Sequence, residues 1–178
     1  MVGLIIGYYY YISNKTTVND IEDSTTEITY VNQLIMRSFT KEYPPTPREV
    51  LKAYADITCA FYTEDYTDEE FEALGMKLRE LFDDDLIKAN PETSYMTALK
   101  TEVINYKTKG MSFSSYATSS ATDVDYYEYN GRKCARLNVT FTVKQGVNAG
   151  LTKETFVMRK DDKGHWKILG WALADDNE

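Results

Sequence analysis

The chain has 178 residues, of which 43% are hydrophobic and 27% charged, and this suits a single globular domain with one hydrophobic core. Its formal net charge is −8, and residues 64–92, with eleven acids and three bases, carry that whole excess. Such a negative field repels phosphate backbones, and no basic stripe occurs elsewhere, so nucleic acid is not an expected partner. Cys59 and Cys134 form no Cys-x-x-Cys pattern, and we predict two free thiols.

The first twelve residues, MVGLIIGYYYYI, are uncharged. They are too few to cross a bilayer, which takes about 20 apolar residues in a helix. Four successive tyrosines after an aliphatic run are typical of the aromatic belt at a membrane interface. We therefore expect residues 1–12 to be the outer part of a truncated membrane anchor, with the missing half upstream of Met1. A buried N-terminal strand or helix is the alternative.

Residues 13–26 are polar and cannot bury enough surface to fold, so they are expected to form a flexible tether. Residues 27–178 are then expected to form one α+β domain. This order predicts a single-pass protein of the cell membrane, with its domain outside the cytoplasm and the membrane as the partner of its N-terminus.

Four helices are predicted before Gly110. The first has a capping-box spacing at Ser24, and the second and third begin after the N-caps Thr46 and Thr67. The fourth begins near Asn90 and ends at Gly110.

The triplet Asp83, Asp84 and Asp85 has two interpretations. Clustered carboxylates suit a hard cation. The side chains of three consecutive acids in a helix, however, point in different directions and do not converge on one ion. No loop with the residue spacing of a calcium site surrounds them. We therefore expect a solvated helix end and no metal site.

After Gly110 the hydrophobic period changes to two, which indicates strands. Residues 112–129 are predicted to form one long strand that turns at Asn130-Gly131, the pair most typical of a type I′ hairpin. Residues 134–143 form the return strand, and residues 151–160 a third. Residues 165–174 are apolar on both faces, which predicts a strand flanked by others and buried on both sides. Helices followed by a curved four-stranded antiparallel sheet define the α+β class.

Two segments, YPPTPREVLKAYADI and RKDDKGHWKILGWAL, resemble the nuclear transport factor 2-like, or cystatin-like, superfamily. The resemblance spans roughly residues 27–174 and is nearest to uncharacterised membrane-anchored proteins of Gram-positive gut bacteria. It implies a cone in which a curved sheet wraps around helices and leaves a pocket at its open end. Some members of this superfamily are isomerases, cyclases or dehydratases, and others are binding or dimerisation modules.

Candidate functional residues are few. His165, beside a predicted turn, is expected to be exposed and to have no catalytic role. The sequence contains no phosphate-binding loop, nucleophile elbow or metal-ligand cluster, so no catalytic residue and no cofactor are predicted. Glu102 and the tyrosines Tyr126, Tyr127 and Tyr129 are the candidates for the mouth of the cone.

Two functions remain open. The first is an extracytoplasmic binding or interaction module that takes a small ligand, a peptide or a second copy of itself, and the 15 tyrosines suit such contacts. The same tyrosines are also ordinary sheet residues. The alternative is an isomerase- or lyase-like enzyme that acts on a small molecule in the pocket. An enclosed pocket with a buried carboxylate near a tyrosine would favour catalysis, and a shallow open face would favour binding.

Overall fold

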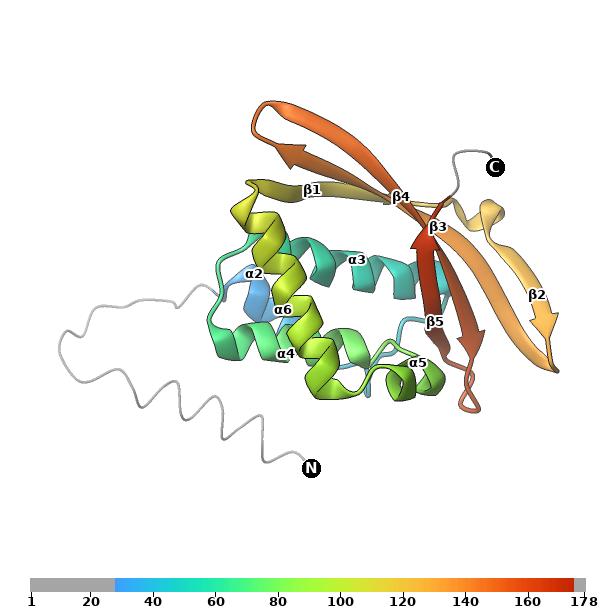
Figure 1. The fold of residues 1–178 in the computed structure, drawn as a ribbon. Helices are drawn as coiled ribbons and strands as arrows, with labels where there is room; N and C mark the ends of the chain where they lie inside the picture. Colours follow the sequence, from blue (N-terminus) through green and yellow to red (C-terminus); the bar gives the residue numbers. More distant parts are fainter. Residues whose placement is uncertain (1–27, 175–178) are drawn as a thin grey trace.

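The computed structural model describes residues 28–174. Within them, helices come first and lie against one face of an open antiparallel sheet of five strands (Figure 1), so the α+β class is confirmed. The helices are α2 (Tyr30–Met36), α3 (Pro47–Thr63), α4 (Asp68–Arg79), α5 (Asp84–Ala89) and α6 (Glu92–Thr108). The strands are β1 (Met111–Thr118), β2 (Asp125–Tyr129), β3 (Arg132–Gln145), β4 (Asn148–Lys160) and β5 (Trp166–Leu173). The predicted membrane anchor and tether lie outside the described residues.

Side-chain caps set the beginnings of four helices, and three of these caps are threonines. Thr46 accepts a hydrogen bond from the backbone of Glu49, and Thr67 forms a complete capping box with Glu70, as the sequence predicts. The N-cap of α2 is Thr29, so that helix begins at Tyr30. The predicted cap at Ser24 lies outside the described residues.

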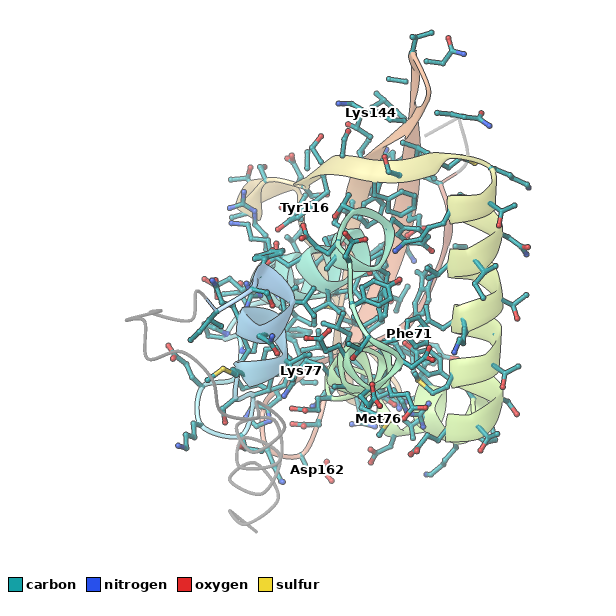
Figure 2. The ribbon with its side chains drawn as sticks, turned by 90° about the vertical axis from the view of Figure 1, so that its left-hand side faces the viewer. Phe71, Met76, Lys77, Tyr116, Lys144 and Asp162 are labelled. Carbon is teal, nitrogen blue, oxygen red and sulfur yellow. The ribbon has the colours of Figure 1, made fainter. Side chains whose placement is uncertain are left out.

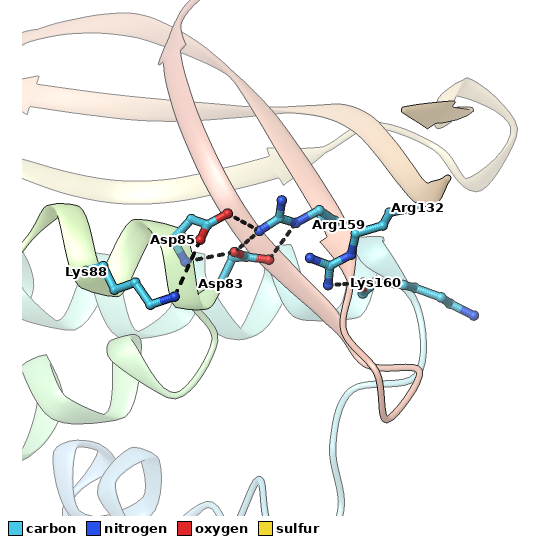
Figure 3. Close-up of polar contacts among 6 residues, drawn as sticks. All are labelled: Asp83, Asp85, Lys88, Arg132, Arg159 and Lys160. Carbon is cyan, nitrogen blue, oxygen red and sulfur yellow. Dashed lines mark hydrogen bonds and ion pairs between the residues drawn. The ribbon is translucent and has the colours of Figure 1, made fainter. Parts of the chain in front are cut away.

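The prediction of four helices was wrong for the described chain, because α5 separates α4 from α6. Asp83 is the N-cap of α5 and accepts a hydrogen bond from the backbone N–H of Asp85. Its side chain is 3% exposed and lies against the guanidinium of Arg159 on β4, while Asp85 contacts the same guanidinium (Figure 3). The expectation of a solvated helix end therefore holds for Asp84 and Asp85, which are exposed, and was wrong for Asp83, which caps α5 and attaches it to the sheet.

The strand order is β1-β3-β4-β5, and β2 also pairs with β3. β1 and β2 occupy different lengths of β3, so the single strand predicted for residues 112–129 is two strands, and the sheet has five. Ser119 causes the break: its hydroxyl bonds both the N–H and the C=O of Asn138, and a 3₁₀ turn (Ala121–Asp123) follows. The hairpin turn is confirmed, since Asn130 and Gly131 both have positive φ.

β5 is an edge strand, so the prediction of a strand flanked by others was wrong. Its outer edge is covered near Ile168, whose N–H donates to Leu81 O and whose C=O accepts from Asp83 N. Trp171 and Leu173 are 39% and 71% exposed, so the strand is not buried throughout. The sequence of β5 is apolar on both faces, but only the end near Ile168 is covered by another segment. The other end is an open edge.

The hydrophobic core lies between the helices and the sheet face toward them, the inner face. Phe61 of α3, Phe141 of β3 and Phe156 of β4 are almost fully buried there. Each such ring contributes roughly 1.5–3 kcal/mol through burial. At right angles to the first view, Lys144 lies near the end of the β3–β4 hairpin, and Tyr116 lies between β1 and the helices (Figure 2). The hydroxyl of Tyr116 donates to Asp56 of α3 at 2.6 Å, which joins the two layers.

Candidate functional site

A cavity of about 280 Å³ lies between α3, α6 and the inner face of β3, β4 and β5. We call it the tyrosine cavity, because four tyrosines line it together with two glutamates, Tyr54, Tyr62, Tyr95, Tyr106, Glu102 and Glu154. Phe and Leu side chains and Trp171 complete much of its wall. Aromatic lining with a few polar groups is the usual character of a small-molecule site.

Strand alternation places Glu154 in this cavity. Side chains two residues apart point to the same face, so Glu154 shares the inner face of β4 with Phe156 and Met158, both fully buried. In the sheet, Glu154 pairs with Val139 on one side and Leu173 on the other. A carboxylate therefore occupies a position whose neighbours are apolar.

Helix α6 supplies the second carboxylate. Val103 is its one buried residue, and Glu102, which precedes it, is an exposed residue that lines the cavity. The hydroxyl of Tyr62 on α3 donates a hydrogen bond to Glu102 Oε1 at 3.2 Å. Burial and the charge of Glu102 together raise the pKa of Tyr62 well above its ordinary value, so the phenol remains protonated and a donor.

Burial and the neighbouring charge of Glu102 act on Glu154. Burial raises the pKa of Glu154 to about 7, and the nearby charge of Glu102 contributes to the shift. No Lys, Arg or His lines the cavity, and neither glutamate forms an ion pair within residues 28–174. Their negative charge is thus not compensated by the part of the chain that the structure describes.

The side-chain hydroxyl of Thr58, on α3, also lines the tyrosine cavity. Its Oγ1 is buried and forms no hydrogen bond of standard geometry among the described residues, although the hydroxyl of Tyr54 lies near it. Three other helical threonines behave differently, because Thr63, Thr97 and Thr101 each donate to the carbonyl four residues earlier. A buried hydroxyl left without a partner costs about 1–3 kcal/mol, so this group is available to a bound molecule.

The structure separates the four residues predicted for the cone mouth. Glu102 lines the tyrosine cavity. Tyr126, Tyr127 and Tyr129 lie on β2 and are not among its lining residues. The ring of Tyr126 contacts that of Trp166 at 5.7 Å, and the guanidinium of Arg136 lies 5.6 Å from the Tyr127 ring. Tyr129 is 65% exposed, so these three tyrosines form a surface strand apart from the cavity.

The sequence reasoning missed Glu154, Thr58 and the four tyrosines of the cavity. For Glu154 a signal was present: it lies at alternate positions of one strand with the apolar residues Phe156 and Met158, so an acid is predicted on the same face as two core residues. An ionisable residue at such a position is a functional-site candidate. For Thr58 the sequence holds no comparable signal, because its missing partner is a property of the packed structure.

His165 lies outside the cavity. Its ring stacks on Tyr43 at 4.3 Å, and Nδ1 is 3.5 Å from a carboxylate oxygen of Asp161. These contacts join the β4–β5 turn to the segment before α3. The imidazole is 38% exposed, in line with the expectation of an exposed residue beside a turn.

A second, more open hollow of about 480 Å³ lies between α2, α3 and β1. It contains Cys59, and burial, with a contribution from Asp56, raises the pKa of this thiol to about 12. A protonated thiol is a poor nucleophile and a poor metal ligand. Both cysteines are free, as predicted.

Two kinds of feature are absent from the described residues. No group of three or more His, Cys, Asp or Glu side chains within residues 28–174 is placed to hold a metal ion. In the same part of the chain, none of the helices combines the length and apolar character that crossing a bilayer requires.

Comparison with known proteins gives a family. No curated protein matches the chain. Residues 1–171 match the family described as "Domain of unknown function (DUF6715)". Since that match spans nearly the whole sequence, the chain belongs to the DUF6715 family.

Proposed function

We propose that this protein is a binding module that takes a small molecule in the tyrosine cavity. The observation that carries the proposal is the cavity itself, of about 280 Å³, with aromatic walls, two carboxylates and a hydroxyl without a partner. Pockets for drug-sized ligands measure roughly 300–1,000 Å³, so this one suits a compact ligand. The resemblance to the cone-shaped superfamily supports a ligand pocket, because that fold leaves a pocket at its open end where a curved sheet wraps around helices.

The module is proposed to work outside the cytoplasm, held at the cell membrane through its N-terminus. Support comes from the uncharged run and four tyrosines of residues 1–12 and from the polar residues 13–26. A tether of that composition would leave the cavity accessible to molecules outside the membrane.

One observation favours an enzyme as the second candidate. A carboxyl group with a pKa of about 7, as at Glu154, suits a general base or acid at neutral pH. The protonated phenol of Tyr62, bonded to Glu102, would supply a hydrogen-bond donor to a developing negative charge. An isomerase- or lyase-like reaction needs such a pair. Binding is proposed first because it requires only the cavity and its uncompensated charge.

Blocking the cavity tests the proposal. Ala98 of α6 lines the cavity yet is exposed, so Ala98→Trp should obstruct it without disturbing the core. Ala149→Trp, on the exposed β3–β4 hairpin and away from the cavity, is the matched control. We expect ligand-observed NMR with a library of small amines, alcohols and carboxylic acids to identify binders of the wild type and of Ala149→Trp that do not bind Ala98→Trp. Equal binding to all three proteins would place the ligand elsewhere and contradict the proposal.

A further inference from the structure

The charges of the tyrosine cavity all have one sign. Glu102 and Glu154 line it from α6 and β4, and no basic side chain lines it with them. A single positively charged ligand would neutralise the negative charge of the two glutamates, which no described residue compensates. An anionic ligand would meet two carboxylates without a cation to hold it.

The walls around these carboxylates are aromatic. The rings of Tyr54 and Trp171 lie 5.5 Å apart, and Phe156 stacks on the Trp171 ring at 5.4 Å. On the helix side, the rings of Tyr62 and Tyr106 lie 5.1 Å apart. The negative π-faces of aromatic rings attract organic cations, and the attraction is larger when water is excluded.

The donor set does not suit a divalent metal. Hard cations such as Ca²⁺ take six to eight oxygen ligands, and Mg²⁺ an octahedron of oxygens. The cavity offers two glutamates, one of them already accepting the hydroxyl of Tyr62, amid apolar rings. A bulky, weakly hydrated organic cation matches rings and carboxylates together.

We propose that the tyrosine cavity takes a small organic cation, a protonated amine or a quaternary ammonium, whose positive group lies between Glu102 and Glu154 against the aromatic rings. The inference rests on the proposed function, because it names the class of ligand for that same cavity. The hydroxyl of Thr58, which has no partner within residues 28–174, supplies a hydrogen-bonding group for a polar atom elsewhere on the ligand.

Three probes of similar shape and different charge test the proposal: 2-phenylethylamine as the cation, 2-phenylethanol as the neutral molecule and 3-phenylpropanoate as the anion. Isothermal titration at pH 8, where the amine is protonated and Glu154 is ionised, gives the three affinities. We expect the amine to bind with a Kd below ~1 mM and at least about tenfold more tightly than the alcohol. The anion should show no binding.

Matched variants assign the effect to the two carboxylates. Glu102→Gln and Glu154→Gln should each weaken amine binding by about tenfold or more and leave the affinity for the alcohol nearly unchanged. Glu92→Gln, at the exposed start of α6, and Glu128→Gln, on exposed β2, remove the same charge away from the cavity and should not change the affinity for the amine.

The outcomes separate this inference from the proposed function. If the alcohol or the anion binds as tightly as the amine, and Ala98→Trp abolishes that binding, the cavity is a ligand site but the cation inference is overturned. Amine binding that Glu102→Gln and Glu154→Gln do not weaken also overturns it. If none of the three probes binds, the inference fails, and the library screen against wild type, Ala98→Trp and Ala149→Trp decides the proposed function separately.

Discussion

Asp83 and Arg159, 76 positions apart in the sequence, join helix α5 to strand β4 through a bidentate ion pair. The guanidinium Nε donates to Asp83 Oδ2 at 3.0 Å, and Nη2 donates to Asp83 Oδ1. The hydrogen bonds that Arg159 donates to Asp83 and Asp85 raise the pKa of Arg159, and the one to Asp85 lowers the pKa of Asp85. Asp83 also caps α5 through the N–H of Asp85, so one carboxylate begins a helix and attaches it to the sheet (Figure 3).

Replacing Asp83 should therefore show two separable effects. Asp83→Asn keeps an N-cap side chain and loses the charge, whereas Asp83→Ala loses both and leaves Arg159 without its buried partner. We expect Asp83→Ala to lower the free energy of unfolding by about 3 kcal/mol or more, and Asp83→Asn by less. Urea denaturation measures both. Asp84→Asn, at the exposed neighbouring position, is the control, and a loss as large as that of Asp83→Ala would contradict the assignment to Asp83.

Glu154→Gln should stabilise the protein at neutral and alkaline pH. The pKa of Glu154 rises from its ordinary 4.5 to about 7 on folding, so the native state binds the proton more tightly than the unfolded state. Stability is then lost as pH rises from about 4.5 to 7. Glutamine has no charge to lose, and above pH 7 we expect this variant to gain about 1–2 kcal/mol, after allowance for partial solvent contact.

Thermal unfolding from pH 4 to 8 checks the pH prediction. The difference in stability between Glu154→Gln and wild type should grow across this interval, while Glu128→Gln, at an exposed site, should follow the wild-type curve. A constant offset between Glu154→Gln and wild type would show that the carboxyl group does not titrate with a raised pKa.

Gly131→Ala should destabilise the β2–β3 hairpin. Gly131 has a φ of +71°, and a methyl group there would meet no atom within 4 Å, so the cost is conformational. We expect a loss of roughly 1 kcal/mol, the usual penalty for a side chain in the left-handed region. Gly150→Ala has equally open space and no positive φ, so it should be neutral or slightly stabilising. Equal melting temperatures for the two variants would contradict this account.

The proposed membrane anchor predicts where the protein is found. In cells that express the natural gene, the domain should fractionate with membranes and be cleaved by protease added outside the cell. Salt and alkaline carbonate washes distinguish an inserted anchor from peripheral attachment, and a cytoplasmic enzyme serves as the control for cell integrity. Recovery of the domain with that cytoplasmic control would refute the anchored location and leave the fold and the cavity unaffected.

Local signals in the sequence account for the parts of the fold that were predicted. The caps at Thr46 and Thr67 and the turn at Asn130-Gly131 depend on interactions within a few residues, so their chemistry is visible in the sequence. Helix α5 was missed for the opposite reason. The cap that Asp83 forms is a local interaction. Asp83 is buried, however, because it pairs with Arg159, and only folding brings these two residues together.

The candidate site was less predictable than the fold. Glu102 was named from the sequence, but its neighbours in the cavity come from α3 and β4, and no sequence spacing relates them. The tyrosines of β2 were named with Glu102 as candidates for the cone mouth, but the fold places them outside the cavity. Glu154 could have been found as an acid on the same strand face as Phe156 and Met158, whereas the volume between the layers depends on how helices and sheet pack.

The contacts at the edge of β5 bear on how the protein behaves at high concentration. An open edge presents unpaired N–H and C=O groups on which a strand from another molecule can assemble, and this is a common route to aggregation. Here Leu81 and Asp83 already bond the backbone of Ile168, and the register with β4 shifts between Val157 and Met158, which is a bulge. An incoming strand would find no continuous row of free groups and no regular edge to follow. The helix–sheet junction thus also hinders the addition of a strand at this part of the β5 edge.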